Sequence, residues 1–386
     1  MEDWFLQNGF YGNLNMHELA VNNLSLFFFL GLCITTIIYF ILPQRWKLDG
    51  VAVCTGLFLW TISPLSLTWI LISTLMTWYA SKIKTSQTKY MVIITSLLCF
   101  VFLLYQFVEN DTHLVSQSII LIGIGYYTCR NIHVLIELYK GTISSLSLRQ
   151  YLHYQLFLPV ILNGPIHRYH HFVRQCQRCH YSWGNTFDST ERILYGSFKV
   201  IFIGSYLLSA KFKYLLNNYE ISGFFLQFVL SMDDWLILYV VFSGYMDIAL
   251  GFAKIWGFSL EENFNSPFLA RNLIDFWQRW HISLSSWCKD YIYTPVIAHS
   301  RNGILAAFLA MMAIALWHNV SLYYFLWGLY QGLGIILFRA YQKTNFVPLQ
   351  KLPNFINKFI AQVTTFTWLV SAKPIIQILL LKLKHI

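Results

Sequence analysis

The stretch from residue 275 to 293, DFWQRWHISLSSWCKDYIY, gathers acids, bases and a histidine in a chain that has few of them. The sequence of 386 residues is 56% hydrophobic and only 11% charged. Within the stretch, His281 follows Trp280 directly and lies four positions after Trp277. A histidine so close to two tryptophans is hard to explain as part of a solvated face. Because histidine titrates near neutrality, its side chain is suited to moving protons. We therefore take this stretch as a candidate for acid–base chemistry.

The same stretch has the spacing of an amphipathic helix. Asp275 and Arg279 lie four positions apart, in the acid-first order that favours an ion pair on a helix. On one continuous helix a single face would carry Trp277, His281, Leu284 and Cys288. The alternative interpretation is a cytoplasmic surface helix whose tryptophans lie at the level of the lipid headgroups.

A second histidine, His318, lies between two apolar runs. The run 303–317 reaches only ~22 Å at the rise of an α-helix, which is less than the ~30 Å of a bilayer core. We therefore expect His318 to be recessed in the membrane, where an ionisable group is a functional candidate. Burial favours the neutral imidazole, which is the form that accepts a proton. A core histidine bound to a backbone carbonyl is the alternative.

An acidic residue, Asp247, also lies within an apolar run. Gly244 and Gly251 flank it, and glycines allow helices to pack closely. A buried carboxylate needs a partner, and we expect Lys254 or a histidine to supply it. Structural pairing is the interpretation that we favour for Asp247.

The segment 163–183, NGPIHRYHHFVRQCQRCHYSW, is rich in histidine and cysteine. Its CQRCH has the spacing for c-type haem attachment, and the cysteines and histidines have the ligand chemistry for zinc. Haem attachment of that kind takes place outside the cytoplasm, whereas the charge pattern places this segment inside. A basic cytoplasmic lid is the favoured interpretation, with a re-entrant turn at Gly164 and Pro165, and we expect no metal.

Long apolar runs predict an all-α, polytopic membrane protein. About 20 helical residues cross a bilayer, and the continuous runs argue against the short alternating segments of a β-barrel. We expect roughly ten or eleven transmembrane helices, with re-entrant and amphipathic cytoplasmic segments between them. The candidate spans are 24–43, 48–63, 65–80, 90–107, 114–127, 193–210, 234–255, 303–317, 322–341 and 355–370. We expect an interfacial segment at 1–23 and one membrane domain at 24–386.

Charge predicts the orientation. Basic loops follow the first and third spans and an acidic loop follows the fourth, which fits an N-terminus outside. The stretch 128–192 has seven Arg or Lys against three Asp or Glu, and we expect it in the cytoplasm. The formal net charge of +10 then reflects orientation and contact with anionic lipid or an anionic substrate, rather than nucleic acid. The seven cysteines are odd in number and lie mostly in spans or cytoplasmic segments, so a disulfide framework is not expected.

Five stretches between residues 122 and 335 together resemble the membrane-bound O-acyltransferase family. In order they are IGIGYYTCRNIHVLIELYKG, LPVILNGPIHRY, FSGYMDIALGFAKIWGF, ENFNSPFLARNLIDFWQRWHISLSSWCKDYIYTPV and LWHNVSLYYFLWGLYQGLGI. The branch that is most similar comprises the membrane subunits that acylate bacterial exopolysaccharides, such as the alginate O-acetyltransferase subunit. The teichoic acid D-alanylation membrane protein is a near relative of that branch.

The resemblance implies helices around a central tunnel with a buried histidine at its middle. His318 matches that histidine, and His281 matches the second histidine of the family. We expect His318 to act as general base and His281 to orient the donor. Asn319 replaces the glycine usual in relatives and is expected to donate to the developing oxyanion, with Trp317 and Trp280 shaping the site. The residues expected to bind the donor, at a cytoplasmic mouth formed by 275–290, are Arg168, Arg271, Arg279 and Asp275.

The implied function is acyl transfer, with acetyl as the expected group. The donor would be a cytoplasmic thioester, either acyl-CoA or an acyl-phosphopantetheine carrier, and the acceptor a hydroxyl of an exported cell-surface polysaccharide. No bound cofactor is expected, and the expected location is the inner (cytoplasmic) membrane, beside a partner transferase or the polysaccharide export machinery. A covalent acyl carrier at Cys288 or a nearby serine is an alternative mechanism.

Three alternative functions stay open. One is D-alanyl transfer toward teichoic acid from a carrier-protein thioester. The second is a transporter or flippase of a lipid-linked sugar, although the paired interrupted helices typical of that class are not evident. The third is a scaffold that has lost catalysis, which the presence of both His281 and His318 disfavours.

Overall fold

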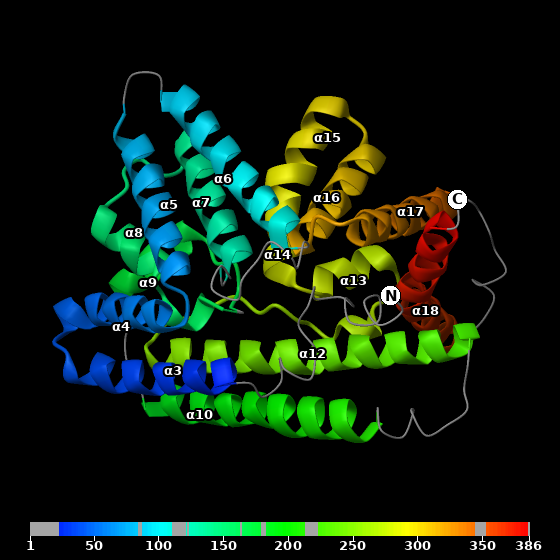
Figure 1. The fold of residues 1–386 in the computed structure, drawn as a ribbon, viewed down its shortest axis with the longest axis horizontal. Helices are drawn as coiled ribbons and strands as arrows, with labels where there is room; N and C mark the ends of the chain where they lie inside the picture. The colour runs from blue at the N-terminus through cyan, green and yellow to red at the C-terminus, as the bar shows by residue number, and fades with distance from the viewer. Residues whose placement is uncertain are drawn as a thin grey trace. The chain divides into compact units, whose positions relative to one another are not determined.

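The computed structural model describes residues 23–83, 87–109, 121, 123–162, 164–178, 183–212, 223–343 and 353–384. Every regular element in these ranges is a helix, as Figure 1 shows, which confirms the all-α prediction for this part of the chain. Phe264 and Trp280 form an isolated β-bridge. The predicted interfacial segment lies outside the described residues except for its last residue, Asn23.

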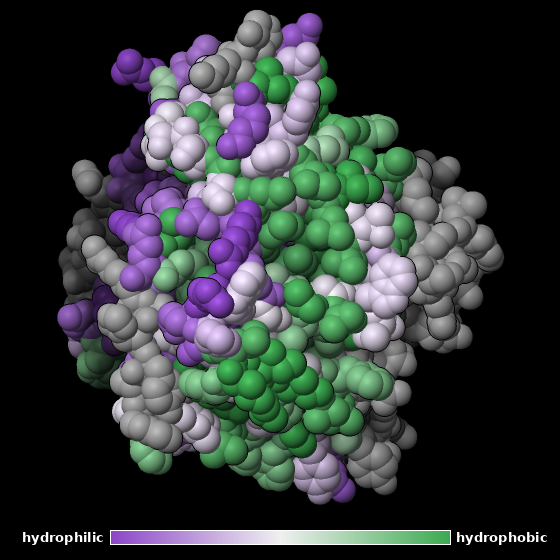
Figure 2. All heavy atoms as spheres, turned by 90° about the vertical axis from the view of Figure 1, so that its left-hand side faces the viewer, coloured by the Kyte–Doolittle hydropathy of each residue, from purple (hydrophilic) through white to green (hydrophobic). Residues whose placement is uncertain are grey.

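Among the described residues, four helices are long and apolar enough to cross a membrane. The segments are Thr88–Gln106, Gly184–Phe212, Gly223–Ile255 and Asn354–Leu383, and two shorter apolar helices are Leu26–Ile41 and Gly303–His318. The larger number of spans expected from hydropathy stays a prediction, as does the single domain. Many large apolar side chains are exposed, including Phe27, Val53 and Leu57. Figure 2 shows hydrophobic side chains gathered over a broad part of one face, which suits contact with lipid.

The chain divides into two compact units. The first contains most of the residues before 207 together with 240–261. Its helices are α3 (Asn23–Ile41), η1 (Gln44–Trp46), α4 (Lys47–Ile62), α5 (Pro64–Lys82), α6 (Gln87–Glu109), α7 (Ile124–Tyr139), α8 (Leu148–Gln155), η3 (Leu158–Val160), α9 (Tyr169–Arg178) and α10 (Trp183–Phe198). The π-helical stretch η4 (Lys199–Phe212) continues α10. Local signals set these boundaries: α5 begins with Pro64 after Ser63, whose side chain accepts a hydrogen bond from the Ser66 amide.

The second unit contains residues 207–239 and 262–386. Its helices are η5 (Pro267–Leu269), α13 (Leu273–Arg279), α14 (Ile282–Cys288), η6 (Lys289–Tyr293), α15 (Thr294–Ser300), α16 (Gly303–His318), α17 (Leu322–Lys343) and α18 (Asn354–Lys384). The long helix α12 (Gly223–Ile255) is shared, since its residues up to 239 belong to the second unit and the rest to the first. Within the second unit α16 packs along α17, and Gly328 of α17 leaves room for Ala315 of α16.

In the first unit, α3 and α10 lie beside the second half of α12 (Figure 1). The α10–α12 contact is tight because glycines face each other. A Cβ at Gly196 would lie 2.5 Å from the carbonyl oxygen of Gly244, and a Cβ at Gly244 would lie 2.8 Å from the carbonyl oxygen of Gly196. The backbones therefore touch directly, as in other closely packed membrane helices.

At the same contact, Asp247 forms two partly buried ion pairs. Asp247 accepts hydrogen bonds from Arg192 Nε at 2.9 Å and from Lys199 Nζ at 2.6 Å. The expected partner, Lys254, pairs with Asp188 instead, so that expectation was wrong. Lys254 lies seven residues after Asp247, whereas Arg192 and Lys199 reach the carboxylate from the neighbouring helix.

Gly196→Ala should destabilise the protein, because the new Cβ meets backbone that cannot move aside as a side chain can. Overpacking of this kind costs about 1–3 kcal/mol, and we expect a lower Tm in thermal unfolding of the detergent-solubilised protein. Gly184→Ala on the same helix is the control, since a Cβ there meets nothing within 4 Å. Equal Tm values for the two variants would contradict the close contact.

Candidate active site

The candidate site lies in the second unit, where the predicted helix around His281 is interrupted. α13 begins at Leu273, with the Asn272 side chain accepting a hydrogen bond from the Asp275 amide at 2.8 Å, and it ends at Arg279. Trp280 is extended, His281 has φ 45° and ψ 54°, and α14 begins at Ile282. The expectation of one continuous helix across His281 was therefore wrong. Few non-glycine residues adopt a positive φ, so the surrounding structure must hold His281 in this conformation.

Residues 263–265 supply that restraint. Phe264 pairs with Trp280 in the β-bridge, and the Asn265 amide donates to the carbonyl of Arg279 at 3.0 Å. On the other side of His281, the Ile282 amide donates to the carbonyl of Asn263 at 3.0 Å. The Ser283 amide donates to Asn263 Oδ1 at 2.9 Å. Backbone contacts thus flank His281 on both sides.

The indole of Trp280 anchors this turn. Its ring stacks on Phe276 with centroids 5.6 Å apart, and it contacts Phe264 and Trp235 edge-on, each at 5.1 Å. Trp280 is buried in this aromatic cluster. It therefore shapes the site by fixing the backbone next to His281.

His318 is the last residue of α16. Asn302 caps the start of this helix by accepting hydrogen bonds from the amides of Ile304 and Leu305. At the other end Asn319 is extended, with φ −169° and ψ 144°, and its side chain is buried. The ring of His318 stacks on Tyr324 at 5.7 Å and meets Trp327 edge-on at 6.0 Å. His318 therefore lies where α16 ends, within an aromatic enclosure that α17 supplies.

One indole joins the two histidines. The Trp317 ring centroid is 5.6 Å from that of His281 and 5.1 Å from that of His318. Burial, with a smaller contribution from His318, lowers the pKa of His281 to about 3. The segment that carries His281 lies outside the four candidate spans. With its pKa lowered in this way, the imidazole of His281 is neutral at physiological pH. Two histidines far apart in sequence thus meet at one indole, with the buried Asn319 next in the chain.

The predicted donor-binding residues are distributed over both units. Asp275 accepts hydrogen bonds from Arg279 Nε at 2.6 Å and from the Arg271 amide at 3.1 Å. The predicted ion pair between Asp275 and Arg279 is therefore present, and Arg271 is exposed at the start of the same segment. Arg168 belongs to the first unit, where it is buried beside His167.

Side chains for a covalent carrier are present near the site but are engaged elsewhere. The hydroxyl of Ser285 donates a hydrogen bond to the backbone carbonyl of Trp280. The hydroxyl of Ser286 donates to the backbone carbonyl of Ser283. In the described ranges no three His, Cys, Asp or Glu side chains gather as a metal site would require. Cys179 and His180 of the CQRCH stretch lie outside those ranges.

Sequence reasoning missed four residues of this site: Asn263, Tyr324, Trp327 and Gln331. The last three lie at i, i+3 and i+7, so they share a face of α17, and this spacing was visible in the sequence. Gln331 is fully buried, and neither of its amide atoms has a hydrogen-bond partner within the described residues. Trp327 on the same face contacts Trp277 of α13 edge-on at 5.7 Å. The face of α17 therefore adds the aromatic rings of Tyr324 and Trp327 to the walls around His318.

Asn263→Ala should loosen the turn that holds His281. The buried Ser283 amide would lose its acceptor, at a cost of about 1–3 kcal/mol, and we expect a lower Tm and faster amide exchange of residues 279–285. Asn265→Ala is the matched control, because its side chain is exposed and its backbone bonds remain. Unchanged exchange in Asn263→Ala would show that the aromatic contacts alone hold the turn.

Comparison with known proteins places the chain in a family. A model of the membrane-bound O-acyltransferase family matches residues 49–371. Teichoic acid D-alanyltransferase of Bacillus subtilis is 31% identical over 58% of this chain and 60% of its own length. The probable alginate O-acetylase of Pseudomonas aeruginosa is 31% identical over 57% of this chain and 42% of its own length. Peptidoglycan O-acetyltransferase of Helicobacter pylori is 29% identical over 58% of this chain and 44% of its own length. The matches thus span less than two thirds of each relative. Because the family match covers most of the chain, the protein belongs to the membrane-bound O-acyltransferase family.

Proposed function

We propose that the protein transfers an acyl group from a thioester donor to a hydroxyl of an exported cell-surface polymer. The observation that carries the proposal is the meeting of His281 and His318 at Trp317, in a member of an acyltransferase family. Either histidine alone would fit a satisfied core residue. Together, beside the buried Asn319 and among aromatic rings, they form a site that can move a proton.

In the proposed mechanism His318 accepts the proton of the acceptor hydroxyl. The hydroxyl oxygen attacks the thioester carbonyl, and the amide of Asn319 donates a hydrogen bond to the oxygen that becomes negative. The new carbon–oxygen bond forms, the carbon–sulfur bond breaks, and the departing thiolate takes the proton from His318. His281 remains neutral, and its imidazole orients the donor by hydrogen bonding to it.

The group transferred is proposed to be acetyl. The similar proteins include one named for D-alanyl transfer and two named for O-acetylation, with identities between 29% and 31%. Identity therefore does not choose between the groups, and D-alanyl from a carrier protein is the second candidate. Arg271 and Arg279 are exposed or partly exposed cations at the start of the His281 segment, and they suit the phosphates of coenzyme A or phosphopantetheine.

The setting of the reaction is also part of the proposal. We place the chain in the inner membrane, with residues 128–192 in the cytoplasm and roughly ten or eleven spans around a tunnel that joins the two faces. The donor enters from the cytoplasm, and an extracytoplasmic transferase or the export machinery is the expected partner on the polymer's side. A transporter would move a lipid-linked sugar with no change to the donor thioester.

His318→Ala should abolish acyl transfer while leaving a folded protein. Loss of a general base costs about 10² to 10⁴ in rate. The assay is transfer from acetyl-CoA, or from a D-alanyl carrier protein, to a soluble oligosaccharide by the purified protein in liposomes. His299→Ala is the control, because His299 is an exposed histidine in the same unit. Equal rates in the two variants would refute the base role, and unchanged donor thioester with wild-type protein would favour the transporter.

The two histidines should give different kinetic defects. His281→Ala should raise the apparent KM for the donor, because it removes an orienting group, whereas His318→Ala should chiefly lower kcat. The measurement is the donor dependence of transfer for each variant. If His281→Ala and His318→Ala changed the apparent KM for the donor and kcat in the same way, the division of roles would be contradicted. That result would indicate that both histidines contact the reacting carbonyl.

A further inference from the structure

The turn that joins α3 to α4 gathers cations and aromatic rings at the surface of the first unit. Between the end of α3 at Ile41 and the start of α4 at Lys47 lies the short helix η1, which carries Arg45 and Trp46. Arg45 and Trp46 are exposed, and Lys47 is partly exposed. The proposed reaction uses none of these side chains.

Aromatic rings hold the cations at this turn. Lys47 Nζ is 4.6 Å from the centroid of the Tyr39 ring. Arg45 Cζ is 5.7 Å from the centroid of the Trp46 ring, and Cζ of Arg149, from α8, is 5.5 Å from the same centroid. A cation over an aromatic face is attracted to the ring but keeps its charge. The rings therefore bring three cations together without neutralising them.

Arg149 also fixes the turn to α8. Its Nε donates a hydrogen bond to Asp49 Oδ1 at 3.0 Å, and its Nη2 donates to Asp49 Oδ2. The same Nη2 donates to the backbone carbonyl of Arg45 at 2.8 Å. His153, one helical turn later on α8, lies with Nε2 3.0 Å from Asp49 Oδ1. These bonds order the turn within the fold itself, so a ligand would not have to order it.

The cations at the turn outnumber the carboxylates that they contact in the described part of the chain. Asp49 is paired with Arg149. The side chains of Arg45 and Lys47 contact aromatic rings, and within the described ranges neither forms an ion pair. The charges of Arg45 and Lys47 are therefore left for an anionic partner.

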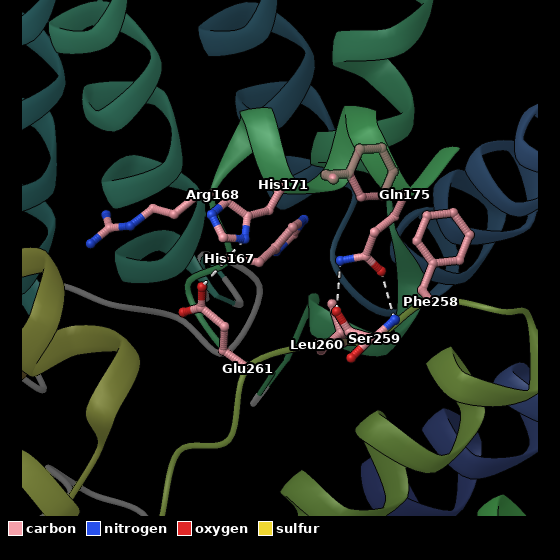
Figure 3. A pocket seen from close by; sticks show the side chains of 9 residues that line it. His167, Arg168, His171, Gln175, Phe258, Ser259, Leu260 and Glu261 are labelled. Atoms are coloured by element: carbon pink, nitrogen blue, oxygen red, sulfur yellow. Dashed lines mark hydrogen bonds and ion pairs between the residues drawn. The ribbon is translucent and has the colours of Figure 1, made fainter. Parts of the chain in front are cut away.

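Polar side chains in a nearby part of the sequence of this unit behave differently. In the hollow between α9 and residues 258–261, Gln175 exchanges two hydrogen bonds with the backbone of Ser259, at 2.7 and 2.6 Å (Figure 3). His171 Nδ1 lies 3.9 Å from a carboxylate oxygen of Glu261 in the same hollow (Figure 3). Contacts within the protein thus engage these groups, which distinguishes the hollow from the α3–α4 turn.

Exposed apolar side chains lead along both helices to the turn. They recur at helical spacing, so on each helix they share one face. They are Phe27, Leu30, Ile34, Ile37 and Ile41 on α3, and Val53, Leu57 and Trp60 on α4. Figure 2 is viewed from the side on which the turn lies in Figure 1, and it shows hydrophilic side chains that border a hydrophobic area. Apolar faces that end at cations and a tryptophan match the boundary between acyl chains and headgroups.

We propose that the α3–α4 turn binds an anionic phospholipid, with the lipid phosphate at Arg45 and Lys47 and the acyl chains along the apolar faces of α3 and α4. Phosphate oxygens accept charge-assisted hydrogen bonds from guanidinium and ammonium groups. A zwitterionic headgroup fits less well, because its own ammonium group would lie beside the cations of the turn. The apolar faces favour a lipid over a soluble phosphate. This binding does not depend on the proposed acyl transfer.

The test is lipid selectivity of the purified full chain in detergent, measured by native mass spectrometry. Phosphatidylglycerol and phosphatidylcholine with the same acyl chains are titrated in competition, and the wild-type protein should prefer phosphatidylglycerol. The double variant Arg45→Gln, Lys47→Gln should weaken phosphatidylglycerol binding about tenfold or more, because each basic residue near anionic headgroups contributes about fivefold. Binding of phosphatidylcholine should change less than about twofold, because its headgroup carries no net charge.

The matched control removes two exposed cations elsewhere in the first unit, through Lys89→Gln and Arg174→Gln. It should change phosphatidylglycerol binding less than about twofold. The charge-conserving variant Arg45→Lys, Lys47→Arg should keep the preference, and thermal unfolding checks that each variant is folded. Equal weakening by the two charge-removing variants, or no lipid preference in the wild-type protein, would overturn the site. Displacement of the bound lipid by glycerol 3-phosphate would also overturn it, by showing a site for soluble phosphate.

Discussion

Charged side chains and backbone groups inside this apolar chain need partners, and that constraint organises the fold. Removing a charge from water is costly unless another charge or several hydrogen bonds replace the solvent. Asp247 therefore draws Arg192 and Lys199 from the neighbouring helix, and Asp234 of α12 pairs with Lys373 of α18. Each pair fixes how two long apolar helices are aligned along their length. Dispersion contacts between such helices would not specify this alignment alone.

The same constraint explains why the turn at His281 has the form it has. A helix that stops inside a packed region leaves amides and carbonyls that need partners. Asn263 and Asn265 provide them through the hydrogen bonds that flank His281, and the aromatic cluster around Trp280 fills the space beside the turn. The imidazole is thereby directed to Trp317 and to the end of α16. A site of two histidines thus depends on a backbone pairing with residues that carry no reactive group.

Hydropathy and local spacing predicted much of this arrangement, because both act within one element. The apolar runs correspond to α4, α5, α6, α16 and α17, and the i, i+4 rule placed Asp275 against Arg279. Long-range contacts escaped prediction. The break at Trp280 depends on Phe264, sixteen positions earlier, and the partners of Asp247 lie on another helix. His281 and His318 were singled out by type and setting, but their shared contact with Trp317 and the enclosure by Tyr324 required the structure.

The most direct test of acyl transfer is the mass of the cell-surface polymer. Polymer would be isolated from cells that contain this chain, from cells that lack it, and from cells restored with the wild-type chain or with His318→Ala. Our account predicts an alkali-labile added mass, equal to acetyl or D-alanyl, that disappears without the chain and returns only with the wild-type protein. The same acylation in cells that lack the chain, or full acylation with His318→Ala at normal abundance, would contradict it.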